Sequence, residues 1–554
     1  MSEPMLAADG RPLKASLNRA LRRQKIRALL LIAPLLFFIL LTFIIPIGQM
    51  LFRSVENQIV GDTIPRTVAQ LDSWTAETGE PPNETVFRAL YYDLFLAAEA
   101  KEHTRLGSRL NYEQAGISSL FRKSGRGLDD LGDAYQDVLE DQNDIWGEGA
   151  FWYAMMNAGA DDTVAESVLQ QQRGLMARLT GESVNSDIGF APRADIAQAL
   201  PLTTQQYTDW ALYTVNFDED IVAEEDPWES IYAALADDLR ASGAATRIGD
   251  YTGPGAEELQ AAFASIGDLP AQSYTAAFEE IDEDWLSVDV WQTIQTYSPP
   301  FTSGYFLNAI DLEKTPDGVA WQSEDEQIYL TLFWRTMVMS LAITVSCILL
   351  GYPVAWLLAN LPASKANLLM ILVLLPFWTS LLVRTSAWKV LLQQQGVINE
   401  LLVWIGIVGD ANRLVLINNA TGTIIAMTHI LLPFMILPLY SVLKTVPPSY
   451  LRAAKSLGAT NWTAFWRVYF PQSVPGIGAG SILVFIMSIG YYITPEIVGG
   501  TKGVFISNRI AYHISSSLNW GLAAALGAIL LAVVLGLYWL YDRIVGIDNV
   551  KLGG

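Results

Sequence analysis

Six long apolar segments stand out along the chain, one near the N-terminus and five in the C-terminal half, with a long polar region between the first two. An apolar helix of about 20 residues is long enough to cross a hydrocarbon core about 30 Å thick. The segments are residues 28–52, 330–358, 367–387, 421–443, 477–499 and 520–541. The pattern therefore predicts an all-α membrane protein with six transmembrane helices.

The N-terminal tail, residues 1–27, is basic and sets the expected orientation. Its cationic residues are Arg11, Lys14, Arg19, Arg22, Arg23, Lys25 and Arg27. A secretory signal also starts with basic residues, but the apolar run here exceeds the usual core of about 7 to 15 residues, and no small-x-small cleavage site follows. We therefore expect an uncleaved first helix with a cytoplasmic N-terminus. Counting crossings then places residues 53–328 outside the cytoplasmic membrane, and residues 444–475 and the C-terminal tail 546–554 inside.

The polar region, residues 53–328, differs sharply in charge from the rest of the chain. It carries 50 Asp and Glu against 15 Lys and Arg, a net charge of −35, whereas the remainder carries 20 basic and 7 acidic residues. Its eight Trp and the helical periodicity of residues 229–240 and 256–266 predict a folded, mainly α-helical extracytoplasmic domain. No internal repeat is evident in it. The only cysteine, Cys347, lies in the second apolar segment, so burial alone is expected to stabilise this domain.

Several classes of chemistry have no support in the sequence. A phosphate-binding loop of the G-x-x-x-x-G-K-[ST] type does not occur, so ATP hydrolysis would have to come from another subunit. The three histidines, His103, His429 and His513, are scattered, and acidic clusters such as residues 218–220 and 282–284 lack the spaced ligands of a calcium loop. We predict no catalytic residues, no metal, no cofactor and no nucleic-acid partner.

Residues 450–476, between the fourth and fifth apolar segments, predict two short amphipathic helices joined at Gly458. The apolar positions are Tyr450, Leu451, Ala454 and Leu457 in the first helix, and Trp462, Phe465, Trp466 and Tyr469 in the second. Gly458 fits a left-handed cap, Thr460 or Asn461 can cap the second helix, and Pro471 is expected to end it. Such a hairpin either docks in the groove of a partner protein or rests its aromatic face on lipid, and spacing alone does not decide.

The fifth apolar segment contains a second candidate functional region. Thr494 and Pro495 are expected to interrupt its helix and free backbone carbonyls, which protein or a water-filled cavity must satisfy at membrane depth. Glu496 follows the break, and Tyr491 and Tyr492 offer aromatic faces to a cation. The alternatives are an interfacial aromatic belt for the tyrosines and a position in external water for Glu496. Trp388, after the third segment, is either a pathway residue or an interface anchor.

These stretches resemble a known family. Residues 450–476 are similar to the coupling loop of permease subunits in ATP-binding-cassette (ABC) importers, with Ala453, Ala454, Gly458 and Pro471 in register. Arg452 stands where that family usually has Glu, and Phe470 stands where it has Leu. The stretches RTSAWKVLLQQQGVIN (384–399) and SIGYYITPEIVGG (488–500) look like the spermidine/putrescine branch. The resemblance covers residues 28–52 and 330–545 and not the acidic domain.

The resemblance implies a type I importer permease: a six-helix bundle, with residues 329–545 as its core, that forms half of a pathway in a bacterial inner membrane. It implies cytoplasmic ATPase subunits, a second permease subunit and an extracytoplasmic substrate-binding protein as partners, and a polyamine as solute. The coupling residues it indicates are Tyr450, Leu451, Arg452, Ala453, Ala454, Leu457, Gly458, Phe470 and Pro471. The candidate pathway residues are Trp388, Tyr491, Tyr492, Thr494, Pro495 and Glu496.

Two other classes of function stay open on the sequence alone. In one, the helices only anchor an extracytoplasmic sensing or interaction module; in the other, the acidic domain is a scaffold that recruits partners. A sensor would need a cytoplasmic output domain, and the cytoplasmic segments expected here are short. The acidic domain fits a polyamine, because negative charge raises the local concentration of polycations, but acidity also serves solubility.

Overall fold

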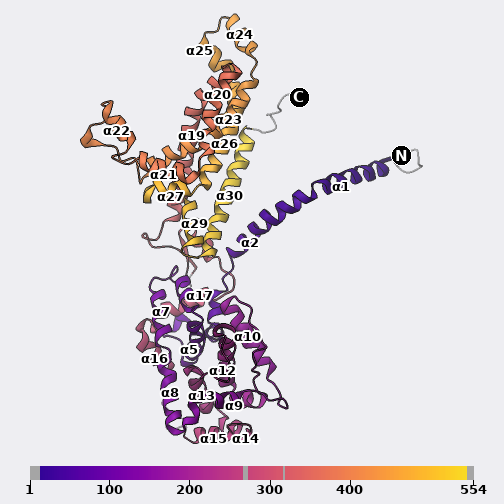
Figure 1. Ribbon diagram of the computed structural model, residues 1–554, viewed down its shortest axis with the longest axis vertical. Helices are drawn as coiled ribbons and strands as arrows, with labels where there is room; N and C mark the ends of the chain where they lie inside the picture. The colour runs from indigo at the N-terminus through magenta and orange to yellow at the C-terminus, as the bar shows by residue number, and fades with distance from the viewer. Residues whose placement is uncertain (1–12, 266–272, 316–317, 546–554) are drawn as a thin grey trace. The chain divides into compact units, whose positions relative to one another are not determined.

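The structure is a computed structural model that describes residues 13–265, 273–315 and 318–545 (Figure 1). The chain divides into two compact units. Residues 1–55, 303–313 and 320–554 form the first, which we call the membrane unit, and residues 56–302 and 314–319 form the second, the insert unit.

The membrane unit contains long apolar helices and, between them, shorter helices and turns. They are α1 (Leu13–Ile39), η1 (Leu40–Ile44), α2 (Ile45–Arg53), α18 (Gly304–Asn308), α19 (Tyr329–Asn360), α20 (Ala363–Leu374), η6 (Leu375–Trp378), α21 (Leu381–Leu391), α22 (Val397–Trp404), η7 (Asp410–Asn412), α23 (Ala420–Thr445), α24 (Pro448–Ser456), α25 (Asn461–Ala464), η8 (Phe465–Tyr469), α26 (Phe470–Gly490), α27 (Ile493–Val498), α28 (Gly500–Gly503), α29 (Ile506–Ser515) and α30 (Trp520–Val545), where η marks a 3-10 or π turn. Among the described residues, five helices are long and apolar enough to cross a bilayer, and a sixth crossing results if the bent α20–α21 pair counts as one. The all-α membrane fold is therefore confirmed.

Two of the expected spans differ from the observed helices. The third, expected as one helix over 367–387, is broken after Trp378 and turns by 95° into α21. The fifth, expected over 477–499, begins with α25 at Asn461 and ends at Gly490. The prediction that Pro471 ends a short helix is wrong, because the helix continues through it. The π turn η8 widens the helix just before Pro471, and a widened turn accommodates a proline, which has no backbone N–H to donate.

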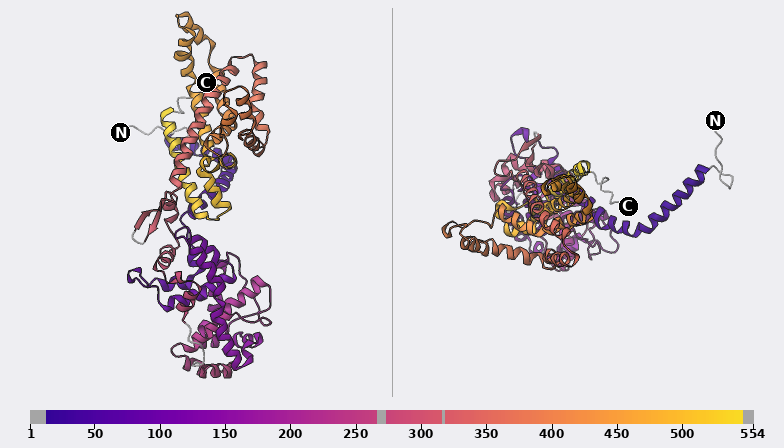
Figure 2. Two further views of the ribbon diagram at one scale, coloured as in Figure 1. Left: turned by 90° about the vertical axis from the view of Figure 1, so that its left-hand side faces the viewer. Right: turned by 90° about the horizontal axis from the view of Figure 1, so that it is seen from above.

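The centre of the membrane unit is the packing of α19 against α23 and of α23 against α26, which lie side by side in Figures 1 and 2. Small residues allow the close approach. A Cβ on Gly480 would lie 2.6 Å from Met435 Sδ, and one on Gly351 would lie 3.1 Å from Met435 Cγ. Small residues at helix contacts are typical of membrane bundles, where dispersion contacts and not water drive association.

The insert unit is mainly helical, as predicted. Its helices are α3 (Ile59–Thr63), α4 (Pro65–Leu71), η2 (Ala76–Thr78), α5 (Glu84–Glu99), α6 (His103–Leu110), α7 (Ile117–Gly127), α8 (Asp129–Gln142), η3 (Asp144–Gly147), α9 (Gly149–Met156), α10 (Glu166–Thr180), α11 (Ala194–Ala199), α12 (Pro201–Tyr213), η4 (Thr214–Asp218), α13 (Glu229–Arg240), α14 (Ala244–Asp250), α15 (Ala256–Ala264), α16 (Tyr274–Ile281), η5 (Glu283–Leu286) and α17 (Val288–Tyr297). A two-stranded sheet, β1 (Leu312–Thr315) and β2 (Gly318–Trp321), follows along the chain. One continuous apolar core contains the largest buried side chains of the unit, among them Trp146, Trp152, Trp285 and Trp291.

The insert unit contains two copies of one arrangement, so the prediction of no internal repeat is wrong. The series α3, α4, α5, α6, α7, α8, η3, α9 is repeated as α11, α12, α13, α14, α15, α16, η5, α17. In the first copy Thr67 N and Oγ1 each donate to Asp93 Oδ2 at 2.8 Å, and in the second Thr203 N and Oγ1 each donate to Asp238 Oδ2 at 2.8 Å. The copies escape notice in the sequence because the matched residues are few and the Thr–Asp separation differs between the copies, from Thr67 to Asp93 in one and from Thr203 to Asp238 in the other.

The two copies also share a tryptophan motif, and through it they interlock. Trp152 Nε1 donates to Trp146 O at 2.8 Å, and Trp291 Nε1 donates to Trp285 O at 2.7 Å. The ring of Trp152 then meets Tyr232 of the second copy at 5.3 Å between centroids. The ring of Trp291 meets Phe87 of the first copy at 5.0 Å. Each copy thus contributes side chains to the core of the other, and we expect the unit to unfold in a single cooperative transition.

Candidate functional site

The expected coupling element is a helical hairpin between α23 and α26. Helix α24 ends at Ser456, and Gly458 follows with φ +89°, the left-handed conformation that favours glycine. The Ala459 amide donates to Ala454 O at 3.1 Å, which closes the end of the helix. Thr460 then caps α25, because its Oγ1 accepts a hydrogen bond of 3.2 Å from the Thr463 amide.

Most of the expected coupling residues lie on the open surface of this hairpin. Leu457 is 89% exposed, and Trp462, a residue of the hairpin outside the expected coupling set, is 72% exposed. The other expected coupling residues of the hairpin that are exposed are Tyr450, Arg452, Ala453 and Gly458, whereas Leu451 and Ala454 are half-buried. Large apolar side chains left in the open by a folded element mark a surface that a partner or a lipid covers.

Aromatic packing fixes the hairpin to α19. The ring of Tyr352 lies 6.1 Å from that of Phe465 and 5.9 Å from that of Phe470, and Ser473 Oγ donates to Tyr352 OH at 3.2 Å. Phe470, expected at the docking surface, is therefore half-buried inside this cluster, while Pro471 is exposed. Sequence reasoning missed Tyr352, because it belongs to a different helix and shows no local pattern that would relate it to the hairpin.

The second candidate region begins where α26 ends. The helix breaks at Tyr491 and Tyr492, a few residues before the expected break at Thr494 and Pro495, which are buried in the next short helix, α27. The break comes early because side chains of α29 satisfy the freed carbonyls. Ser507 Oγ donates to Ile489 O at 2.8 Å and to Tyr491 O at 3.1 Å.

A buried asparagine links this break to the candidate carboxylate. Asn508 Nδ2 donates to Tyr492 O at 2.9 Å and to Glu496 Oε2 at 2.6 Å, and its Oδ1 accepts from the Phe505 amide at 2.9 Å. Asn508 is thereby held at both ends of its amide, and it orients Glu496, which is itself exposed. Tyr492 is exposed and Tyr491 half-buried, so Glu496 and Tyr492 are the members of the expected set that can meet a ligand directly.

Trp388 has a specific polar partner. Its Nε1 donates to His429 Nδ1 of α23 at 3.1 Å, with 5.3 Å between the ring centroids. Nearby in the sequence, Thr385 Oγ1 lies 3.2 Å from Thr494 Oγ1, which joins α21 to α27. The structure therefore brings the third-span motif and the fifth-span motif together, although neither His429 nor Thr385 stood out as a pathway residue.

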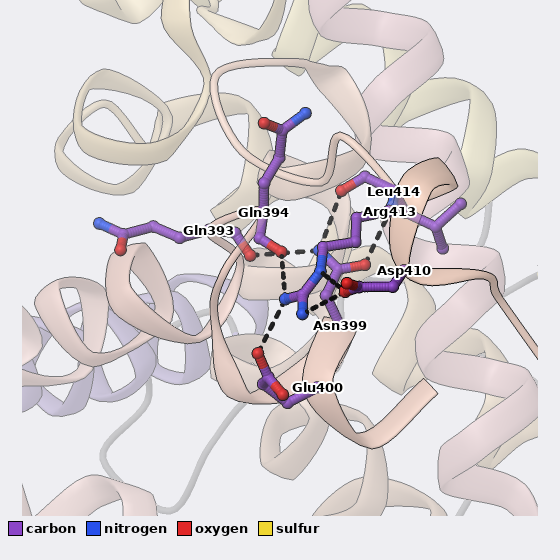
Figure 3. Close-up of polar contacts among 7 residues, drawn as sticks. All are labelled: Gln393, Gln394, Asn399, Glu400, Asp410, Arg413 and Leu414. Carbon is purple, nitrogen blue, oxygen red and sulfur yellow. Dashed lines mark hydrogen bonds and ion pairs between the residues drawn. The ribbon is translucent and has the colours of Figure 1, made fainter. Parts of the chain in front are cut away.

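The loop after α21 is closed by a polar cluster (Figure 3). Arg413 pairs with Asp410 at 2.7 Å and with Glu400 at 2.8 Å, and donates to Gln394 O at 3.2 Å. Asn399 donates to Leu414 O at 3.0 Å and accepts from the Leu414 amide at 3.0 Å. These contacts give the Asn399 of the motif RTSAWKVLLQQQGVIN a structural role.

The coupling hairpin and the Tyr491 region lie at opposite ends of one helix (Figures 1 and 2). The stretch Asn461–Gly490 is 30 residues long, which corresponds to about 45 Å at the rise of an α-helix. A displacement of the hairpin can therefore reach the polar region around Glu496 through a single element. Among the described residues, no group of three or more His, Cys, Asp or Glu is placed to hold a metal ion.

Comparison with known proteins gives matches that cover part of the chain. Residues 334–545 match the family described as binding-protein-dependent transport system inner membrane component. The spermidine/putrescine transport system permease protein PotB of Salmonella typhimurium (strain SL1344) is 36% identical over 223 residues, which are 40% of this chain and 77% of that protein. PotB of Escherichia coli (strain K12) is also 36% identical over 223 residues, 40% of this chain and 80% of that protein. A crystal structure of a bacterial alginate ABC transporter with its alginate pentasaccharide-bound periplasmic protein covers 42% of this chain and 82% of the matched chain, at 19% identity and a TM-score of 0.34.

Proposed function

The chain belongs to the family of binding-protein-dependent transport system inner membrane components, so it is a multi-pass permease subunit of an ABC importer, and we propose that it carries a polyamine such as spermidine or putrescine. It is a transport subunit and not an enzyme. The proposal for the solute rests on the similarity to the spermidine/putrescine permeases over 223 residues. It is further supported by the net charge of −35 that residues 53–328 carry, 50 acidic against 15 basic residues, on the side where the solute would enter.

Membership of this family implies an ATPase and a substrate-binding protein as partners. We infer that the assembly lies in a bacterial inner membrane with both termini in the cytoplasm, and that a second permease subunit completes the pathway. Two ATPase subunits dock below the membrane, and one of them receives the hairpin α24–α25. The binding protein delivers the solute from outside.

The observation that carries the coupling proposal is the exposed hairpin at the end of a long helix. Leu457 and Trp462 are 89% and 72% exposed, and α26, which follows the same hairpin, ends at Gly490, just before Tyr491. Closure of the ATPase subunits as rigid bodies would move the hairpin, and α26 would transmit that movement to the carbonyls around Tyr491 and Tyr492. The pathway would then switch between inward-facing and outward-facing states.

On the solute side, Glu496 and Tyr492 are the proposed contacts for a cation. Glu496 supplies a carboxylate that Asn508 orients. Tyr492, 46% exposed, offers an aromatic face, and a cation over such a face is stabilised by about 0.5–2 kcal/mol. Together they form a recognition point for one ammonium group of a polyamine.

The test is uptake of radiolabelled spermidine into proteoliposomes that hold the complete importer with its ATPase and binding protein. We expect ATP-dependent uptake that unlabelled putrescine reduces, and a several-fold loss in Tyr492→Ala. Tyr538→Ala is the matched control, because Tyr538 is a comparably exposed tyrosine, 44% exposed, on a different membrane helix. If polyamines are not carried while another amine or an amino-acid derivative is, the solute assignment is wrong.

A further inference from the structure

A cavity of about 480 Å³ opens at the start of α19, between that helix and the segment α27–α29. Its volume falls within the range of about 300–1,000 Å³ that small-molecule sites commonly have. Leu332, Arg335, Glu496, Asn508, Arg509 and Tyr512 are among its lining residues. Two guanidinium groups and one carboxylate thus face one space whose walls are otherwise largely apolar or aromatic.

Each of the charged groups is held in place by a neighbour. Arg335 Nη1 donates to Thr501 O at 2.9 Å, and the Arg509 guanidinium lies 5.7 Å from the centroid of the Tyr512 ring. Glu496 accepts through Oε2 from Asn508, a side chain that is itself buried. A guanidinium has further N–H donors to offer, and Oε1 of Glu496 remains to accept a donor from a ligand.

We propose that this cavity binds a zwitterion in which a primary ammonium is joined to a phosphate. Arg335 and Arg509 would take the phosphate, since the planar guanidinium matches phosphate oxygens and makes strong charge-assisted hydrogen bonds with them. Glu496 takes the ammonium. The headgroup of phosphatidylethanolamine and free phosphoethanolamine share this chemistry.

A polyamine does not fit the same description. It carries only positive groups, and the two arginines of the lining would repel those that do not reach Glu496. The ligand chemistry of this cavity therefore differs from that of the solute proposed above, and the inference does not rest on that proposal. Glu496 belongs to both descriptions, so the arginines are the residues that separate them.

The first experiment measures calorimetric binding to the purified full chain. The probes are phosphoethanolamine, inorganic phosphate and spermidine. We expect phosphoethanolamine to bind about tenfold tighter than phosphate, because it gains the contact with Glu496. Arg335→Gln and Arg509→Gln each weaken both phosphate-bearing probes about tenfold or more, whereas Glu496→Gln removes only the preference between them. Lys502→Gln is the matched control, since it deletes an exposed cation of the same segment that does not line the cavity.

The second experiment separates a lipid from a free ligand. The full chain is reconstituted in nanodiscs with equal amounts of phosphatidylethanolamine and phosphatidylcholine, and the lipids that stay bound after extraction are quantified. Phosphatidylcholine has a phosphate but no ammonium N–H, so retention of phosphatidylethanolamine over it, lost in Arg335→Gln and Glu496→Gln, identifies the lipid as the source. Binding of free phosphoethanolamine without such retention identifies the free ligand. The inference is overturned if neither arm shows selectivity, or if Arg335→Gln and Arg509→Gln bind phosphoethanolamine as tightly as the unchanged chain does, and polyamine uptake is scored separately from both.

Discussion

Replacing Gly458 with Val should uncouple ATP hydrolysis from transport without unfolding the membrane unit. Gly458 has φ +89°, and a Cβ built on it would have no atom within 4 Å. The substitution therefore meets no steric barrier from neighbours, and its cost is the backbone conformation alone. A left-handed conformation costs an L-residue about 1–2 kcal/mol, and a β-branched residue stands at the upper end.

That cost acts on the hairpin. At about 2 kcal/mol, the native joint between α24 and α25 becomes about 30-fold less populated relative to competing conformations. The bond from the Ala459 amide to Ala454 O, 3.1 Å long, depends on that joint. A hairpin that changes shape under load transmits less of the ATPase movement, so we expect transport per ATP hydrolysed to fall about tenfold in Gly458→Val, less in Gly458→Ala, and least in Gly458→Asn, because Asn tolerates the left-handed region.

The assay is stimulated ATPase activity and solute uptake, measured together in proteoliposomes with the complete importer. Gly406→Val is the matched control. Gly406 also has a positive φ, +76°, and also has no atom within 4 Å of a built Cβ, but it lies in the loop after α22 and not in the hairpin. Equal uncoupling by Gly406→Val, or a wild-type ratio of uptake to hydrolysis in Gly458→Val, would refute the reasoning.

Three further perturbations test the insert unit and the loop after α21. Burial raises the pKa of Asp238 to about 6, above its value of about 3.8 in an unfolded chain. The protonated carboxyl therefore stabilises the folded state below about pH 4, and up to about 3 kcal/mol of the free energy of unfolding is lost as the pH rises through 6. Asp238→Asn should flatten this part of the pH dependence of stability, measured by circular dichroism of the full chain. Trp291→Leu removes a fully buried ring and should destabilise the insert unit by about 3 kcal/mol, seen as a lowered denaturation midpoint, whereas Trp321→Leu, at a residue 63% exposed, should leave that midpoint unchanged. In Gly396→Ala the new Cβ would lie 2.5 and 2.7 Å from two backbone oxygens, so the loop should become sensitive to trypsin, while Gly409→Ala, with open space at its Cβ, should not.

The sequence predicted the elements that depend on local pattern and missed those that depend on pairing. Apolar length identified the membrane helices, and the left-handed joint at Gly458 followed from the residues around it. The repeat in the insert unit was missed because its sequence evidence is sparse: the pairs Trp146–Trp152 and Trp285–Trp291 share one spacing, whereas the matched Thr–Asp pairs do not. Asp93 accepts two hydrogen bonds from Thr67, and Asp238 accepts the equivalent two from Thr203. No local motif relates one aspartate to the other.

The candidate site shows the same limit at single residues. Thr494 and Pro495 were expected to break the fifth span, on the ground that proline cannot donate, yet the helix ends earlier, at Gly490. The position of the break is decided by Ser507 and Asn508, whose side chains can satisfy carbonyls only where α29 approaches them. A proline gives the reason for a break, whereas the partner that stabilises the freed carbonyls decides its place.

The same reasoning applies to the mechanical link between the hairpin and the pathway. A helix that transmits movement over about 45 Å must resist bending, and the start of this one contains a π turn and two prolines, Pro471 and Pro475, at which backbone hydrogen bonds are missing. Tyr352 packs against the same stretch, with rings 6.1 and 5.9 Å away and a hydrogen bond from Ser473 at 3.2 Å. In the proposed coupling, the stiffness of this helix would therefore come from its packing on α19 and not from the hairpin itself. A residue with no contact to either the ATPase surface or the solute can for this reason control how much of the movement arrives.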